Sequence, residues 1–338
     1  MKVQVIGLGN VGRSLIQLIA KEDEHLKSLG FNLQFVSISD SGGSAVDERG
    51  LDLNEVLKYK KVGWAGFKKY EKGSTALDAI KGIESDVVVE LTASTPTGEP
   101  GLSHIKAALS SRKNVVTANK GPLVVAFNEL VQKAKDKDVK LLYEATVAVH
   151  VPVFCLLSSC FIADEVLKVE GILNATTNFI IGEIESGKSF NGALDAAIKA
   201  GWAEVNYADD VDGVDAARKV VILANFLYHK NFNLEDVNVE GIRKIEPMIR
   251  EATKSNKKAK LICEIRKDND KIQMNVSPKI IPMDDPLATV NHGNMGVKFT
   301  FKTCQEVFVS AQFTSTMQTA YSILNDILKV EKSNCNCQ

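Results

Sequence analysis

The sequence predicts an α/β protein built from an N-terminal doubly wound parallel sheet and a second, α+β domain. Three observations lead to this fold class. A β-branched run at Lys2–Gly7 passes directly into a glycine-rich turn and an amphipathic helix. Strand-like and helical segments then alternate as far as about residue 143, which is typical of parallel sheets with helical crossovers. Beyond that point the alternation stops and a hairpin pattern appears.

The glycine-rich turn follows the first predicted strand without a gap. The segment after that strand has the spacing GxGxxG, and helix Arg13–Lys21 follows with an apolar face. In this context Gly7 permits the tight turn, Gly9 lets a pyrophosphate approach the backbone, and Gly12 lets helix and strand pack closely. The helix N-terminus supplies amide donors and a partial positive charge. The pattern therefore predicts a Rossmann domain that binds a nicotinamide dinucleotide, with contacts from Gly7, Gly9, Asn10, Val11 and Gly12.

A second predicted strand, Leu33–Ser39, leads into Asp40. A carboxylate at this position hydrogen-bonds the adenosine ribose hydroxyls of NAD and repels the 2′-phosphate of NADP. No arginine follows Asp40 directly, and Arg49 lies at the far end of a glycine-rich loop. We therefore expect NAD to be favoured and leave NADP open. The alternative is that Asp40 is an ordinary turn residue at the end of a strand.

The rest of the first domain is predicted to alternate strands and helices. Asp86–Thr92 is a continuous apolar run, as expected for a parallel strand covered on both faces. The turn after it would pass the nicotinamide half of the cofactor, which makes Thr92, Ala93 and Ser94 candidate contacts. The remaining elements are expected to be a loop at Ser41–Gly50, a helix at Asn54–Tyr59, a helix at His104–Leu109, a strand at Asn114–Thr117, a loop at Ala118–Pro122, a helix at Phe127–Ala134 and a strand at Lys140–Tyr143.

The second domain is expected to mix strands and helices without regular alternation. The predicted elements are a strand at Val166–Ile172, helices at Phe179–Gly187, Leu194–Ala200 and Val211–Leu227, and a hairpin formed by Lys260–Glu264 and Lys271–Val276. The basic run Asn256–Lys260 is interpreted as a solvated face. An amphipathic helix at Met317–Val330 closes the chain. We expect a dinucleotide-binding domain at residues 1–143 completed by the helix at 317–330, a catalytic and dimerisation domain at 144–316, and a flexible tail at 331–338.

Composition and charge narrow the class of protein. The formal net charge of −1 gives no electrostatic footprint for nucleic acid or an anionic membrane. No apolar run approaches the ~20 residues that span a bilayer, and a strand at the first residues leaves no room for a signal peptide. The 6 cysteines are scattered, as expected of free thiols in a reducing compartment. We therefore predict a cytoplasmic protein with a small-molecule substrate.

The acid-rich segment Gly201–Lys219 is the strongest functional signal in the chain. It contains five carboxylates and leads into an apolar-rich helical pattern that predicts a buried helix. Asp215 and Lys219 stand four residues apart, so they share one helical face. An acid–lysine pair at the mouth of a buried helix suits an active-site wall better than a solvated surface. The alternative is a surface pair of little energetic consequence.

Four segments resemble the homoserine dehydrogenase family, and they follow its order. They are VVTANKGPL (115–123), YEATV (143–147), EGILNATTNFI (170–180) and GWAEVNYADDVDGVDAARK (201–219). The resemblance implies a Rossmann domain, a catalytic α+β domain and a homodimer formed through strands. It also implies NAD(P)-dependent interconversion of L-aspartate 4-semialdehyde and L-homoserine, a step in threonine, methionine and isoleucine biosynthesis. The chain resembles the short form of the family, without a regulatory domain.

The resemblance also implies roles for individual residues. Lys219 matches the lysine proposed to give a proton to the carbonyl oxygen, with Asp215 as its neighbouring acid. Lys120 matches the second active-site lysine, which also contacts the cofactor; the alternative is a loop lysine after a strand. Glu204 matches the acid that holds the substrate amino group, with Asp210 nearby, and Thr176 matches the threonine of the substrate loop. A monovalent cation such as sodium would be held by Glu144, Val147, Val149 and Val151, although Glu144 could equally pair with a basic neighbour.

Several positions depart from the family pattern. His150 stands among residues that are usually small, Ala175 replaces the glycine of an NGT motif, and Trp202 replaces a usual tyrosine. The glycine-rich turn before the last helix appears as Gln312–Thr316, with bulky Phe313 where backbone amides approach the cofactor. These changes leave two alternatives open beside an active homoserine dehydrogenase. One is a non-catalytic nucleotide-binding relative, and the other is an oxidoreductase acting on a different amino-acid aldehyde.

Overall fold

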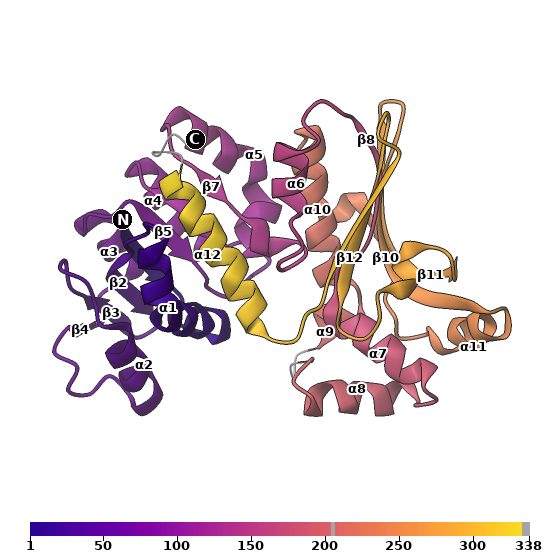
Figure 1. The fold of residues 1–338 in the computed structure, drawn as a ribbon, viewed down its shortest axis with the longest axis horizontal. Coiled ribbons are helices and arrows are strands. Elements are labelled where there is room, and N and C mark those ends of the chain that lie inside the picture. Colours follow the sequence, from indigo (N-terminus) through magenta and orange to yellow (C-terminus); the bar gives the residue numbers. More distant parts are fainter. Residues whose placement is uncertain (204–206, 333–338) are drawn as a thin grey trace. The chain divides into compact units, whose positions relative to one another are not determined.

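The computed structural model describes residues 1–203 and 207–332. The chain folds as two compact units (Figure 1). Unit 1 comprises Met1–Thr146 and the C-terminal segment from Ser315, and unit 2 comprises Val147–Thr314. The predicted fold class is confirmed, because unit 1 holds a largely parallel sheet between helices and unit 2 a separate, largely antiparallel sheet with its own helices.

The sheet of unit 1 has the strand order β4-β3-β2-β1-β5-β6-β7. Strands β2, β1, β5, β6 and β7 run parallel, as predicted, and the edge strands β3 and β4 are antiparallel. The prediction of a loop throughout Ser41–Gly50 is wrong, because the chain turns at Gly42 and β3 pairs with β2, burying Ala45. The strands are β1 (Lys2–Ile6), β2 (Gln34–Asp40), β3 (Gly43–Val46), β4 (Tyr70–Lys72), β5 (Val87–Glu90), β6 (Asn114–Thr117) and β7 (Leu141–Leu142).

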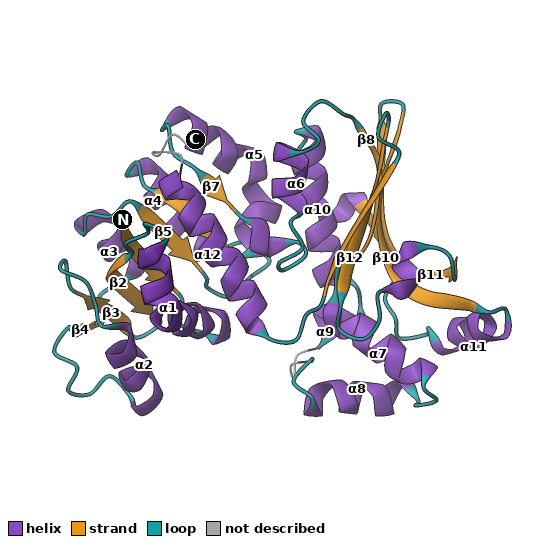
Figure 2. Cartoon of the chain, viewed as in Figure 1, coloured by secondary structure: helices purple, strands orange, loops and turns teal. Residues whose placement is uncertain are grey.

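The predicted helices of unit 1 lie close to their expected positions and extend further, whereas α3 was not predicted (Figure 2). The predicted loop Ala118–Pro122 is wrong from Lys120 onward, because α5 begins there. Asn119 caps that helix by accepting a hydrogen bond from the Gly121 amide at 3.1 Å. The helices are α1 (Asn10–Ser28), α2 (Leu53–Val62), α3 (Ala76–Gly82), α4 (Gly101–Ser110), α5 (Lys120–Asp136), the short η1 (Glu144–Thr146) and α12 (Thr316–Lys332).

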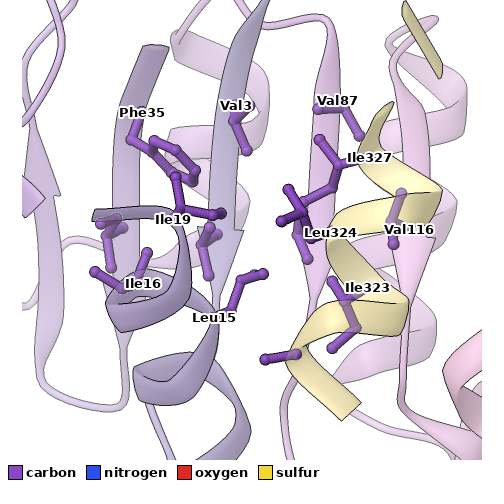
Figure 3. Close-up of a cluster of buried hydrophobic side chains, with 14 of the residues drawn as sticks. Val3, Leu15, Ile16, Ile19, Phe35, Val87, Val116, Ile323, Leu324 and Ile327 are labelled. Atoms are coloured by element: carbon purple, nitrogen blue, oxygen red, sulfur yellow. The ribbon is translucent and has the colours of Figure 1, made fainter. Parts of the chain in front are cut away.

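The last helix belongs to the core of the first unit. Helix α12 presents apolar residues at helical spacing, and it packs beside α1 over the strands (Figure 3). In the close-up, side chains from α1 meet β1 and β2 while those from α12 meet β5 and β6. The buried side chains labelled there are Val3, Leu15, Ile16, Ile19, Phe35, Val87, Val116, Ile323, Leu324 and Ile327. Helix α12 runs to Lys332, two residues into the segment expected to be a tail, and residues 333–338 lie outside the described part.

Unit 2 contains a six-stranded sheet of order β13-β12-β8-β10-β11-β9. The predicted hairpin is confirmed and is longer than expected, since β10 and β11 pair along their whole length. The strands are β8 (Val166–Ile172), β9 (Val237–Val239), β10 (Lys257–Asp268), β11 (Lys271–Pro282), β12 (Met295–Phe301) and β13 (Glu306–Ala311). The helices are α6 (Val153–Ser159), α7 (Ala175–Glu185), α8 (Phe190–Lys199), α9 (Ala208–Val211), α10 (Val214–Tyr228) and α11 (Glu246–Lys254), with short turns η2 (Leu234–Asp236) and η3 (Pro286–Thr289).

Two expectations for unit 2 are wrong. The single helix predicted at Val211–Leu227 is broken at Gly213, whose φ of 81° is left-handed, so α9 ends before α10 begins. The basic run Asn256–Lys260 is a solvated face only at its start, because Asn256 and Lys257 are exposed whereas Lys260 is 1% exposed. Its ammonium donates to Asn178 Oδ1 at 3.0 Å and to the Val290 carbonyl at 2.7 Å. Burial lowers the pKa of Lys260 to about 8.

Within the described residues, the helices are all too short or too polar to cross a membrane.

Candidate active site

A cavity of about 590 Å³ opens at the carboxyl edge of the unit 1 sheet. Five of the predicted cofactor contacts line it, namely Gly7, Gly9, Asp40, Thr92 and Ala93. Asn10, Val11 and Gly12 follow directly in the first turn of α1, whereas Ser94 and Lys120 are not among the lining residues. A second cavity, of about 650 Å³, lies beside Met1 and Arg49 and is lined by none of the predicted site residues. We therefore place the candidate cofactor site in the first cavity.

The glycine turn has the geometry that a dinucleotide requires. Gly7 has a φ of 98°, and a Cβ there would lie 2.6 Å from the Leu91 carbonyl carbon. A Cβ on Gly12 would lie 2.1 Å from the Gly7 oxygen, so the helix can pack on the turn only without a side chain. A Cβ on Gly9 would meet nothing within 4 Å. Gly9 therefore borders open space at the start of α1, where a pyrophosphate can reach backbone amides.

The Asp40 carboxylate is held by four donors. Its Oδ1 accepts hydrogen bonds from the Gly42 amide and the Tyr70 hydroxyl, each at 2.9 Å. Its Oδ2 accepts from Lys60 Nζ at 2.5 Å and from Trp64 Nε1 at 2.9 Å. Burial alone would raise the pKa of Asp40, but the bonds from Lys60, Trp64, Gly42 and Tyr70 outweigh it and lower the pKa to about 2. A ribose diol would have to displace one of these donors.

A buried glutamate behind the same cavity was not predicted from the sequence. Glu90 ends β5, inside a run read only as apolar, and it is 0% exposed. Its Oε1 accepts from the amide and hydroxyl of Thr92 and lies 3.5 Å from His104 Nδ1. The Thr92 hydroxyl also accepts from Asn119 Nδ2 at 3.2 Å, which connects this carboxylate to the start of α5. A charged residue within a strand predicted to be buried is unusual, and this feature of the sequence could have identified Glu90 as a candidate functional residue.

Unit 2 brings the predicted acids and lysine into one cluster. Lys219 Nζ lies 2.9 Å from Asp215 Oδ2 and donates to the Leu173 carbonyl at 2.5 Å, and Lys219 is 8% exposed. The surface-pair alternative is therefore wrong for this pair. Asn174 donates from Nδ2 to Asp210 Oδ1 at 2.7 Å and to Asp215 Oδ2 at 3.0 Å. Asn174 also caps α7, and it was not among the predicted site residues.

The remaining predicted substrate residues are placed as follows. The Thr176 hydroxyl donates to the Trp202 carbonyl at 2.6 Å, so the threonine holds the segment that leads toward the acid-rich motif. Glu204, predicted to hold the substrate amino group, lies outside the described residues. Lys120 belongs to unit 1 and Lys219 to unit 2, and a joint role for the two lysines stays a prediction.

The segment predicted to hold a monovalent cation contains a buried carboxylate with a basic neighbour. Glu144 Oε2 lies 3.8 Å from Lys329 Nζ. Pairing of Glu144 with a basic residue is the alternative to cation binding that the sequence analysis left open. Val149 has a φ of 55°, an unusual conformation for a β-branched residue. His150 is half-buried, and burial lowers the pKa of its imidazole. Across residues 1–203 and 207–332, no three His, Cys, Asp or Glu side chains form a group suited to a metal ion.

Two of the departures from the family pattern pack against each other. The Trp202 ring stacks on Phe179 with centroids 5.5 Å apart and meets Phe313 edge-on at 5.7 Å. Gly293 makes room for this ring, because a Cβ there would lie 2.2 Å from it. The Phe313 amide donates to Asn294 Oδ1 at 3.3 Å. The bulky residue in the turn thus completes an aromatic cluster in unit 2.

The sheet order, the glycine turn and the cavity of unit 1 define a dinucleotide-binding domain, and the buried acid–lysine cluster of unit 2 is suited to proton transfer. The class of protein is therefore a nicotinamide-dependent oxidoreductase. Comparison with known proteins gives the family. A model described as homoserine dehydrogenase, NAD binding domain, matches residues 7–144, and one described as homoserine dehydrogenase matches residues 152–328. The chain belongs to the homoserine dehydrogenase family.

Individual relatives agree with this assignment along almost the whole chain. A homoserine dehydrogenase of Methanocaldococcus jannaschii is 36% identical over 340 residues, covering 98% of this chain and 99% of the relative. An NAD(+)-dependent homoserine dehydrogenase of Pseudomonas canavaninivorans is 34% identical, covering 98% and 96%. The crystal structure of homoserine dehydrogenase from Thermoplasma acidophilum superposes with a TM-score of 0.86 at 28% identity, covering 98% of this chain and 99% of that one.

Proposed function

We propose that this chain interconverts L-homoserine and L-aspartate 4-semialdehyde with a nicotinamide dinucleotide, and that Lys219 is the proton donor and acceptor. The observation that carries the proposal is the buried Asp215–Lys219 pair, held in place by Asn174 and the Leu173 carbonyl. A lysine ammonium has three N–H donors. Two of them meet acceptors among the described residues, and we assign the third to the substrate oxygen.

In the reducing direction the dinucleotide supplies a hydride to the carbonyl carbon when it is bound. Lys219 supplies the proton that the developing alkoxide requires, and it takes the proton back in the reverse reaction. Asp215 keeps the amine oriented and balances its charge, and Lys219 is largely buried. We assign Asp210 and Glu204 to the substrate amino group, because an α-amino acid carries a cation there, and Thr176 to the support of the substrate loop.

For the cofactor, we propose that NAD is favoured and that NADP is also accepted. The chain has no arginine next to Asp40, and Asp40 would repel a 2′-phosphate. However, Lys60 lines the same cavity and neutralises Asp40, so a cation stands where the ribose phosphate of NADP would arrive. The residues of the glycine turn fit a pyrophosphate, since Gly9 borders open space. The second lysine, Lys120, starts a helix directly after the β6 strand end, a position suited to contact with the cofactor.

Three further parts of the proposal rest on the family resemblance. A monovalent cation such as sodium would be held by backbone carbonyls of Val147, Val149 and Val151 with the Glu144 carboxylate, and the left-handed φ of Val149 supports an unusual carbonyl orientation there. The homodimer would form through the unit 2 sheet, where Lys168, Glu170, Glu264, Lys279 and Lys298 form an ion-pair network across neighbouring strands. The cytoplasmic location stays a prediction.

The experiment that tests the function is homoserine-dependent reduction of NAD and of NADP at alkaline pH. We expect activity with both cofactors and a lower KM for NAD. The Trp202–Phe313 contact lies beside the substrate loop and favours one alternative, a different amino-acid aldehyde as substrate. Reduction of the cofactor by another 4- or 5-carbon amino-acid alcohol in place of homoserine would support that alternative. Cofactor binding measured by calorimetry without any turnover would support a non-catalytic nucleotide-binding relative.

A further inference from the structure

Glu90 is a carboxylate buried within unit 1 to which the reaction assigns no role. It is 0% exposed at the end of β5, and one of its oxygens, Oε2, is buried with no hydrogen-bond partner among the described residues. A buried carboxylate that is only partly paired costs several kcal/mol. Neither the glycine turn nor the acid–lysine cluster needs such a group. We therefore consider whether Glu90 acts on a ligand bound in the cofactor cavity.

The donors around Glu90 suit a carboxylate anion. The Thr92 amide donates to Oε1 at 3.1 Å and the Thr92 hydroxyl donates to the same oxygen. On the other side, the first turn of α4 comes so close that a Cβ on Gly101 would lie 3.1 Å from Oε2. The N-terminal end of a helix carries a partial positive charge, which favours an anion beside it. Glu90 is thus held between the turn after β5 and the start of α4.

This carboxylate lies directly behind the wall of the cofactor cavity. Leu91, Thr92 and Ala93 follow it in the chain and line the cavity, and His104, 3.5 Å from Glu90, lines it too. Strand β5 pairs with β1 on the side opposite β2. In doubly wound sheets the adenosine half of the cofactor lies toward β2, the strand that ends at Asp40. The nicotinamide half of the cofactor therefore lies toward β5. Glu90 is the carboxylate on the nicotinamide side.

The two oxidation states of the cofactor differ in charge at that end. The oxidised nicotinamide ring carries one positive charge, and the reduced ring is neutral. A fixed negative charge near a site from which water is excluded stabilises the cationic form more than the neutral one. We propose that Glu90 determines the preference of the enzyme between the oxidised and reduced cofactor. The inference rests on the proposed dinucleotide site and adds to it the charge that sets the balance between its two ligands.

The test is the variant Glu90→Gln, which removes the charge and keeps the shape. Dissociation constants for the oxidised and reduced forms of the same cofactor would be measured by calorimetry on the full chain. We expect the ratio of the oxidised to the reduced constant to rise about tenfold, the size that one charge in a partly desolvated site produces. Equal changes in both constants would overturn the proposal, because a purely structural role would weaken both forms alike.

Thr92→Val is the matched control. It removes a hydroxyl that donates to Glu90 but changes no charge, so we expect both constants to rise by the same factor. If Glu90→Gln does not fold, the unmodified protein still tests the proposal: it should bind the oxidised cofactor at least as tightly as the reduced one. Reduced cofactor bound more than about tenfold tighter would overturn the inference. Failure of the unmodified protein to bind either form would instead overturn the dinucleotide site itself, and this inference with it.

Discussion

The two units each contain an acid–lysine pair, and the pairs are built in different ways. In unit 1, Asp40 and Lys60 are 20 residues apart and meet at 2.5 Å, with the acid side chain 8% exposed and the lysine side chain 25% exposed. In unit 2, Asp215 and Lys219 are 4 residues apart on α10, and their side chains are 15% and 10% exposed. The first pair buries its acid more deeply than its lysine, and both residues line the cavity. The second keeps both groups inside.

The difference shows which member of each pair is available for chemistry. Asp40 accepts four hydrogen bonds, so its carboxylate is saturated, and we expect Lys60 to be the member of the pair that contacts a ligand. Lys219 meets two acceptors and has a third N–H, so in unit 2 the lysine is the group with remaining capacity. An acid–lysine pair therefore does not define a function by itself. We propose that the number of other hydrogen-bond partners distinguishes a pair with a structural role from a pair that can transfer a proton.

Replacing Lys219 tests the comparison most severely. Lys219→Ala should lower turnover by about 10²–10⁴-fold, the usual contribution of a general acid, and leave the dissociation constant of the cofactor nearly unchanged. Steady-state kinetics with homoserine and calorimetry with NAD would measure the two quantities. Lys188→Ala, which removes an exposed lysine paired with Glu183, is the control. Turnover within a few-fold of the unmodified protein would show that Lys219 is not the proton donor.

The next largest effect is expected from Asn174, which positions both acids of the unit 2 cluster. Asn174→Asp keeps the oxygen that caps α7 but replaces the amide donors with an oxygen facing Asp210 and Asp215. Turnover should fall about 10–100-fold, because small displacements of a catalytic group are costly. Thermal unfolding measured alongside kinetics separates this effect from loss of the cap. If Asn174→Ala, which does lose the cap, kept full activity, the positioning role would be wrong.

In unit 1 the saturated acid should affect stability rather than chemistry. The pKa of Asp40 is about 2 in the folded chain, below its ordinary value of 3.8. This difference contributes ~2 kcal/mol of stability above about pH 4, and the contribution is lost as the pH falls toward 2. Asp40→Asn should therefore lower the unfolding free energy at pH 7 by ~2 kcal/mol, with a smaller difference at pH 3. Denaturant titrations at both pH values would measure it.

The control for Asp40 is Asp212→Asn, since Asp212 pairs with Arg243 at an exposed position. That variant should leave the unfolding free energy nearly unchanged. An equal loss in the two variants would contradict the distinction between a saturated, buried acid and a solvated one.

The smallest effect is expected from Lys60, the available member of the unit 1 pair. Lys60→Ala should weaken NADP by about fivefold to tenfold, since a charge-assisted contact to the 2′-phosphate is lost, and should leave NAD unchanged or slightly tighter. Competition calorimetry with both cofactors would measure the ratio. Lys61→Ala, at an exposed neighbouring position, is the matched control. An unchanged NADP to NAD ratio would remove Lys60 from cofactor selection.

Local patterns predicted most of the fold and the contact between Asp215 and Lys219 in the candidate site. Hydrophobic periodicity located β1, β6 and β8 almost to the residue, and the i,i+4 spacing of Asp215 and Lys219 predicted a contact that lies within one helix. The donors to Asp40 could not be predicted in this way. Trp64 and Tyr70 reach it only because the chain returns as β3 and β4 at the sheet edge.

The burial of Lys260 and Glu90 was missed for a related reason. Charged residues are usually expected to be solvated, yet Lys260 is compensated by Asn178 and the Val290 carbonyl, which are distant in sequence. Glu90 accepts hydrogen bonds from the nearby Thr92 and lies beside His104, 14 residues further along the chain. Long-range polar compensation leaves no periodic signal in a single sequence. The contact between Trp202 and Phe313 belongs to the same class, since two residues 111 positions apart explain each other.

The return of α12 to unit 1 has a consequence for the order in which the chain can be made and folded. The core under β5 and β6 is closed by Ala320, Ile323, Leu324 and Ile327, which are synthesised after the whole of unit 2. Unit 2 is continuous from Val147 to Thr314 and can fold as soon as it is synthesised. Until the final helix arrives, the earlier-made part of unit 1 has an open apolar face, and exposed apolar surface of this kind favours aggregation.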